Sequence, residues 1–148
     1  MTNKPNVKLT FKTRKLTIAI DFDGTIVEDK YPKIGAPRTF AFETLKLFQD
    51  VGHRLILWTY REGKQLEEAI SFCQMKGLNF YAINKSHPEE KKPYSTRKIH
   101  ADIFIDDRNF GGLPEWGVIG QKILGHEIIN SKNHFIQKKS IWKSIFRW

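Results

Sequence analysis

Apolar residues gather in four short runs along the chain, and each run has the length and branching of a buried strand. The clearest run covers residues 16–20 and stops abruptly at an aspartate. The predicted strands lie at 16–20, 54–58, 79–83 and 101–105, and a short fifth strand is expected at 118–119.

Helical spacing fills the gaps between these runs. Residues 38–50 and 62–75 each place apolar side chains on one helical face, and a glycine follows shortly after each segment. Weaker helices are expected at 123–129 and 136–146. Strands that alternate with helices predict a parallel sheet covered by helices. The expected fold class is therefore α/β, a three-layer α/β/α Rossmann-like domain.

Length and charge refine this prediction. The 148 residues suit one domain, with a core that we place at 16–120. The net charge of +9 is concentrated in two basic extensions, 1–15 and 126–148, with five Lys and Arg residues each. Residues 16–125 hold 15 basic and 15 acidic residues. Any attraction to nucleic acid or to an anionic membrane therefore belongs to the ends, and a solvated basic edge is the simpler interpretation.

The C-terminal extension spaces apolar residues between lysines over 141–146. One interpretation is a last helix docked on the sheet or on a second subunit of a homo-oligomer. The other is a basic amphipathic helix that lies on a membrane or binds nucleic acid. No window is apolar enough to span a bilayer, and the first residues lack the apolar centre of a secretory signal, so we expect a cytoplasmic protein. The single Cys73 excludes an intrachain disulfide.

Candidate chemistry begins where the first strand ends, in the segment LTIAIDFDGT. Asp21 and Asp23 point the same way if the strand continues, because strand side chains alternate with period two. Two like charges at about 4 Å repel by roughly 4 kcal/mol at an effective dielectric of ~20, and a divalent cation relieves that cost. A calcium loop of the EF-hand type is excluded, because Ile26 and Pro32 stand where it needs Gly and Glu. A purely structural turn is the alternative to a metal site.

Other polar residues follow other predicted strands at the same end. Thr59 comes after the second strand, and Asp106 and Asp107 come after the fourth. In open parallel sheets, ligands bind beyond the carboxyl ends of the strands. These side chains should therefore converge with Asp21 and Asp23 on one rim of the sheet.

Taken together, these motifs resemble those of the haloacid dehalogenase-like hydrolases. The D-x-D-G-T at 21–25 resembles their first motif, Thr59 after LILW resembles the second, and IDD at 105–107 resembles the acidic fourth motif. The resemblance covers about residues 16–120. The ending RKIHADIFIDDRNFGGLPEWG looks like that of small uncharacterised bacterial members.

The resemblance implies a Mg²⁺-dependent phosphatase that acts through an aspartyl-phosphate. Asp21 would be the nucleophile, and Asp23 would protonate the leaving oxygen and then activate water. The implied metal ligands are Asp21, Asp106, Asp107 and the backbone carbonyl of Asp23. The Thr59 hydroxyl and backbone amides after Asp21 would hold phosphoryl oxygens. The implied substrate-binding residues are Phe22, Gly24, Thr25, Thr59, Tyr60 and Arg61.

The family also uses a lysine beside the phosphoryl group. Lys85 follows the third strand on the expected rim and is the preferred candidate. Lys98 is the alternative, although five strand residues span ~17 Å and would place it near the opposite end of the sheet. Arg61 and Arg108 either contact an anionic substrate or pair with surface acids.

The gaps at 26–37 and 84–97 are too short for a folded cap domain, because independent folding is rare below ~40 residues. The resemblance then implies a capless core with an open site, with 84–97 as a local lid. Such a site suits a phosphorylated small molecule, a phosphoprotein or a nucleic-acid end, or a site closed by another subunit. A rival hypothesis is a weakly active or inactive module that binds an anionic partner through its basic ends.

Overall fold

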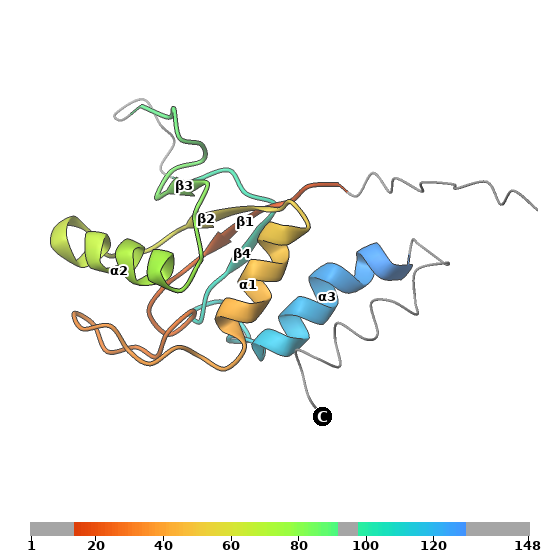
Figure 1. Ribbon diagram of the computed structural model, residues 1–148, viewed down its shortest axis with the longest axis horizontal. Helices are drawn as coiled ribbons and strands as arrows, with labels where there is room; N and C mark the ends of the chain where they lie inside the picture. The colour runs from red at the N-terminus through yellow and green to blue at the C-terminus, as the bar shows by residue number, and fades with distance from the viewer. Residues whose placement is uncertain (1–13, 92–97, 130–148) are drawn as a thin grey trace, which may run out of the picture.

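A central parallel sheet organises the fold (Figure 1). The computed structural model describes residues 14–91 and 98–129. Its strands are β1 (Thr17–Ile20), β2 (Arg54–Leu57), β3 (Ala82–Ile83) and β4 (Ile103–Ile105). They pair in the order β3-β2-β1-β4, and every pairing is parallel. The predicted α/β class with a parallel sheet is confirmed.

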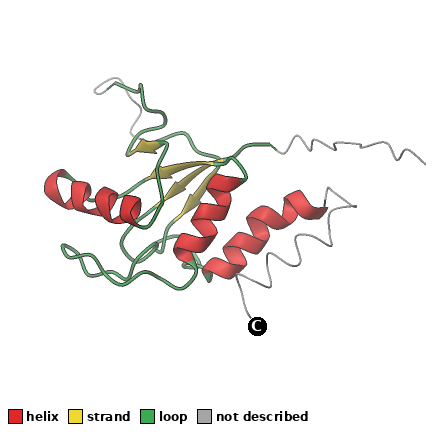
Figure 2. Ribbon diagram, in the orientation of Figure 1, coloured by secondary structure: helices red, strands yellow, loops and turns green. Residues whose placement is uncertain are grey.

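In the described part of the chain, three helices pack against one face of this sheet (Figure 2). They are α1 (Ala41–Asp50), α2 (Gly63–Met75) and α3 (Trp116–Ile129). Alternate strand residues, among them Ile18, Ile20 and Leu55, enter one apolar core with residues of all three helices. Burial of these side chains is the main favourable term that holds the layers together. None of the described helices is long and apolar enough to cross a membrane.

The opposite face of the sheet has a different cover. Ala19, Ile56 and Ala82 on that face form a second, smaller cluster with Ile99. A right-handed crossover explains this, because β3 and β4 lie on opposite sides of β1 and the chain between them must cross that face. The expected third layer is thus formed, within the described residues, by part of the β3–β4 connection and not by a helix.

Several predicted boundaries shift. The first helix begins at Ala41 because Phe40 has a left-handed φ of 63°. The fourth strand begins at Ile103 and not at residue 101. The Asp102 carboxylate, just before it, accepts a hydrogen bond from the Thr17 N–H at 2.8 Å. The third strand shrinks to Ala82–Ile83 at the sheet edge.

The predicted strand at 118–119 is wrong. Both amides of that dipeptide donate to the Glu115 carbonyl, as in a helical turn, and the segment lies inside α3. Its apolar residues follow helical spacing, with Trp116, Ile119 and Leu124 buried. The helix predicted at 136–146 and most of both basic extensions lie outside the described residues.

The strand order creates a switch point at β1. From β1 the chain proceeds to β2 and β3 on one side, while β4 joins on the other. Ile20 pairs with Leu57 and with Ile105, so the three strands end level. Residues that follow these strands share one rim, where open α/β sheets bind their ligands.

Candidate active site

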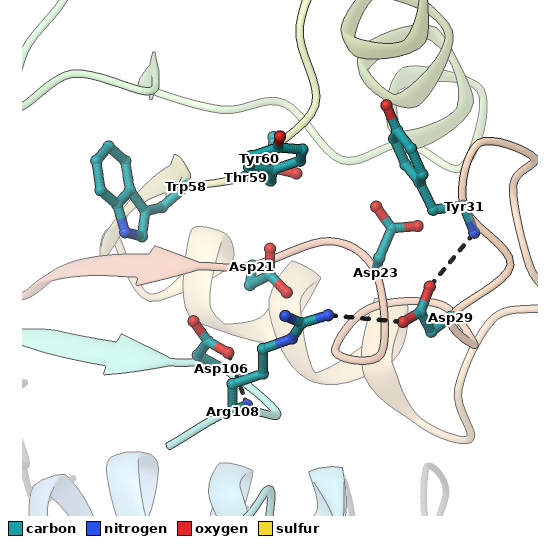
Figure 3. A pocket seen from close by; sticks show the side chains of 9 residues that line it. All are labelled: Asp21, Asp23, Asp29, Tyr31, Trp58, Thr59, Tyr60, Asp106 and Arg108. Carbon is teal, nitrogen blue, oxygen red and sulfur yellow. Dashed lines mark hydrogen bonds and ion pairs between the residues drawn. The ribbon is translucent and has the colours of Figure 1, made fainter. Parts of the chain in front are cut away.

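Three carboxylates meet at the switch point. Asp21, Asp106 and Asp107 each offer an oxygen, and these atoms lie within 4.8 Å of one another. The Asp21 N–H donates to the Ile105 carbonyl at 3.0 Å, which continues the β1–β4 ladder and brings the aspartates together. The Arg108 N–H donates to Asp106 Oδ1 at 2.8 Å and orients that carboxylate. We call these three residues the acidic cluster (Figure 3 shows Asp21 and Asp106).

The turn after β1 supports the acidic cluster. The Asp107 N–H donates to Thr25 Oγ1 at 3.0 Å, and the Thr25 hydroxyl lies 3.4 Å from Asp21 Oδ2 as a donor. Thr25 is buried, and its carbonyl accepts the Trp116 indole N–H at 2.8 Å. The D-x-D-G-T segment is therefore fixed to both β4 and α3.

The lack of a side chain at Gly24 allows the Asp107 carboxylate to lie against the turn after β1. A Cβ on Gly24 would lie only 2.3 Å from Asp107 Oδ2, and the φ of +76° disfavours any L side chain. In the described part of the chain, Asp107 Oδ1 is buried without a hydrogen-bond partner. A buried carboxylate oxygen left unpaired is costly, so this atom suits the role of a cation ligand.

The electrostatics point the same way. Burial, together with the negative charges of Asp106, Asp107 and Asp23, raises the pKa of Asp21 to about 7, although a hydrogen bond from the Phe22 backbone opposes the shift. Burial and the neighbouring Asp106 also raise the pKa of Asp107. The acidic cluster is thus short of positive charge. Its donor set is all oxygen, which is what Mg²⁺ and Ca²⁺ prefer.

Asp23 has a different environment. Arg61 Nε and Nη2 donate to its two carboxylate oxygens at 2.7 Å each, which is a bidentate pair. The Arg61 side chain is 0% exposed, and it also donates to the Pro32 and Lys33 carbonyls at 3.0 and 2.7 Å. Its guanidinium carbon lies 5.0 Å from the centre of the Phe22 ring. Of the two predicted roles for Arg61, pairing with an acid is the one observed, and the pair is partly buried and not on the open surface.

Thr59 stands at the same rim beside these charges. Its N–H donates to the Asn84 side chain at 2.8 Å, and its hydroxyl oxygen accepts the Arg61 N–H at 3.2 Å. A hydroxyl group that accepts one hydrogen bond can still donate its own proton, here to an anionic oxygen. Asn84 has a left-handed φ of 51° just after β3, and no periodicity in the sequence indicates its role.

The two candidate lysines differ in position. Lys85 Nζ donates to the Pro88 carbonyl at 2.7 Å, beyond the edge strand β3. Lys98 lines a cavity together with Asp106, and its Nζ lies 5.9 Å from the Phe104 ring centre. The prediction that placed Lys98 at the opposite end of the sheet is wrong, because 98–102 does not extend β4. Ile99 packs on the face of the sheet instead and brings Lys98 toward the rim.

An open cavity of about 730 Å³ covers the site (Figure 3). Among its lining residues are Asp21, Asp23, Thr59, Tyr60 and Asp106, which the sequence indicated. Asp29, Tyr31 and Trp58 also line it, and sequence reasoning did not assign them to the site. Arg108 reaches across it and lies 4.0 Å from Asp29 Oδ2. Asp29 and Tyr31 belong to an aperiodic loop, so only their proximity to the D-x-D motif could have suggested them.

Some predicted substrate-binding residues are buried and support the site residues instead of lining the cavity. The Phe22 side chain is 0% exposed and belongs to the main core, so only its backbone is available to a ligand. Gly24 and Thr25 are buried and position Asp107 and Asp21. The structure brings together the ends of β1, β2 and β4, as expected from the parallel order.

A solved structure is similar to this chain in both sequence and fold. No protein-family model and no curated protein matches the chain. The solved structure of a conserved protein from Bacteroides thetaiotaomicron is 57% identical, with a TM-score of 0.73, and the match covers 76% of this chain and 93% of that chain. The chain belongs to the family of that protein. A match at this identity means that the family shares the parallel α/β fold described above, and the chemistry must be argued from the site.

Proposed function

We propose that the protein is a Mg²⁺-dependent phosphohydrolase of the haloacid dehalogenase-like superfamily. The supporting observation is the acidic cluster, in which the oxygens of Asp21, Asp106 and Asp107 lie within 4.8 Å of one another at the switch point. A structural turn alone would not need these carboxylates so close together. The orphaned Asp107 Oδ1 fits a bound cation.

Asp21, Asp106 and Asp107 would hold the Mg²⁺ ion, and the backbone carbonyl of Asp23 remains a further candidate ligand. When bound, the ion supplies the positive charge that lets an anionic phosphoryl group approach a carboxylate. Lys98, beside Asp106, is our choice for the lysine that balances the remaining phosphoryl charge. The Thr59 hydroxyl donates to a phosphoryl oxygen.

The reaction proceeds in two displacements. In the first, an Asp21 oxygen attacks phosphorus, the bond to the leaving oxygen breaks, and the leaving group takes a proton from Asp23. In the second, water attacks the aspartyl-phosphate, Asp23 accepts the water proton, and phosphate and free Asp21 result. The Arg61 pair holds the Asp23 carboxyl group in a fixed position at the rim, where it can serve both displacements.

The direct test is hydrolysis of para-nitrophenyl phosphate with and without Mg²⁺. We expect turnover that needs the ion and that Asp21→Asn reduces by at least about a thousand-fold, because the nucleophile is lost. The matched control is Asp50→Asn, which changes an exposed aspartate at the end of α1. Circular dichroism checks that both variants fold. Full turnover by a folded Asp21→Asn protein would sink the mechanism.

A further inference from the structure

Aromatic side chains form one side of the cavity. Trp58 and Tyr60 flank Thr59 just beyond β2, and Tyr31 comes from the loop after β1. Tyr60 is 91% exposed and Tyr31 is 50% exposed. Exposed aromatic surface next to a polar site is more often a binding surface than a packing accident. We call Tyr31, Trp58 and Tyr60 the aromatic wall.

Two members of the aromatic wall, Tyr31 and Tyr60, are in contact with each other. The Tyr31 and Tyr60 ring centres lie 6.4 Å apart at 70°, an edge-to-face contact. Tyr31 is also held from behind, because the buried Arg61 bonds to the next two carbonyls and its guanidinium carbon lies 5.3 Å from the Tyr31 ring centre. A wall with few conformations to lose costs less to organise on binding.

The charges around the cavity suggest what it would hold. In Figure 3 the aromatic wall lies on one side, Asp106 and Arg108 lie on the other, and Asp21 lies between them. Asp29 stands at the Tyr31 end of the cavity and lies 4.0 Å from Arg108, so that end has no surplus positive charge for a second anionic group. A neutral planar group fits that end better, and its face can stack on the exposed Tyr60 ring.

On the basis of the phosphohydrolase function proposed above, we propose that the substrate is a nucleoside monophosphate whose base stacks on the aromatic wall while its phosphate meets Asp21. The cavity of about 730 Å³ lies within the range of small-molecule sites and has room for more than a phosphate. The gaps at 26–37 and 84–97 are short for a folded cap domain, so loops of the core that line the cavity are the source of selectivity we propose.

The test compares adenosine 5′-monophosphate with ribose 5-phosphate, which both carry phosphate on the primary 5-hydroxyl of a ribose and differ in the base. We expect kcat/KM to favour the nucleotide by about ten-fold, in line with stacking of one base. Tyr60→Ala should bring the ratio of the two kcat/KM values close to one, mainly through KM. Tyr60→Phe keeps the ring and should retain the preference. Phe110→Ala removes another exposed aromatic, outside the cavity lining, and should also retain it.

Binding separates this proposal from the proposed function. If no phosphate ester, para-nitrophenyl phosphate included, is hydrolysed, the phosphohydrolase function fails. Calorimetry of both ligands with Mg²⁺ then still tests the aromatic wall. Tighter binding of the nucleotide, weakened about ten-fold by Tyr60→Ala, supports it. Equal binding or equal kcat/KM for the two ligands overturns it, and so does a nucleotide preference that survives Tyr60→Ala.

Discussion

The two aspartates of the D-x-D motif lie two residues apart and yet have opposite surroundings. Around Asp21 the charges that act on its pKa are the carboxylates of Asp106, Asp107 and Asp23. Asp23 instead receives two charge-assisted hydrogen bonds from the buried Arg61. Burying a charge is costly unless it is paired, and at Asp23 the Arg61 guanidinium offsets the desolvation of the carboxylate. At Asp21 a bound cation would have to offset it.

This difference gives the two aspartates of the motif different roles. A carboxylate held by Arg61 keeps its position whether or not a ligand is present. The acidic cluster is instead repulsive by itself and becomes favourable when a cation binds. Substitutions and conditions that change one side should therefore leave a different signature from those that change the other.

The largest expected effect on stability comes from breaking the arginine pair. Arg61→Met should lower the free energy of unfolding by about 3–5 kcal/mol, because Asp23 and two loop carbonyls lose their partner in a buried place. Urea unfolding followed by circular dichroism measures this. Arg54→Met is the matched control, because Arg54 is exposed and its guanidinium stacks on Tyr81, and the substitution should cost below about 1 kcal/mol. A loss for Arg61→Met as small as for Arg54→Met would mean that the pair is not structural.

The pH dependence of the free energy of unfolding should reveal the repulsion within the acidic cluster. The pKa of Asp21 is raised in the folded state to about 7 from 3.8, so between these values the folded protein binds more protons than the unfolded chain. Without metal, its contribution to stability is therefore full below pH 4 and is lost as the pH rises through 7. The loss is at most about 4 kcal/mol, since each unit of pKa corresponds to about 1.4 kcal/mol.

Mg²⁺ should reverse this trend, because it binds the ionised carboxylates. We expect the ion to raise Tm more at pH 8 than at pH 5, as measured by calorimetry with EDTA-treated protein as the reference. Asp21→Asn should flatten the metal-free pH dependence, because the substituted side chain does not titrate. A metal-free protein that becomes more stable from pH 4 to pH 7, and in the same way in the variant, would contradict the assignment to Asp21.

The lysine beside the acidic cluster gives a smaller effect, on rate alone. Lys98→Met should lower kcat/KM by about 100-fold, the usual cost of removing one donor from a developing anion. Lys85→Met should have little effect, because its ammonium is committed to the Pro88 carbonyl. Steady-state assays of both variants with the same phosphate ester compare them. The opposite ranking would return the role to Lys85.

Sequence pattern predicted the acidic side better than the paired side. Asp21, Thr59 and Asp106 each follow an apolar strand, and parallel strands end at one rim, so their approach follows from strand order alone. The pairing of Asp23 with Arg61 could not be predicted from strand order. Arg61 lies 38 residues away in the sequence, and its choice of Asp23 over solvent depends on a loop path that has no periodicity.

Packing also decided what the lysines do. Counting strand residues placed Lys98 at the far end of the sheet, on the assumption that residues 101–105 all belong to the fourth strand. The strand is shorter, and Ile99 is buried against Ala19 and Ile56 on the sheet face. That contact is a tertiary one, and the sequence around Ile99 does not distinguish it from a solvated turn.

The smallest predicted effect concerns the glycine that lets the acidic cluster close. Gly24→Ala should destabilise the protein by about 1–2 kcal/mol for the positive φ alone, and further because its Cβ would meet Asp107 Oδ2 at 2.3 Å. Gly112→Ala is the matched control, since Gly112 has the same φ of +76° and nothing within 4 Å of its added Cβ. The excess loss in Gly24→Ala over Gly112→Ala therefore measures the contact with Asp107. If Asp107 ligates the ion, the rise in Tm on adding Mg²⁺ should also shrink in Gly24→Ala and persist in Gly112→Ala. Equal shifts in the two variants would assign Asp107 a structural role and leave the cation to Asp21 and Asp106.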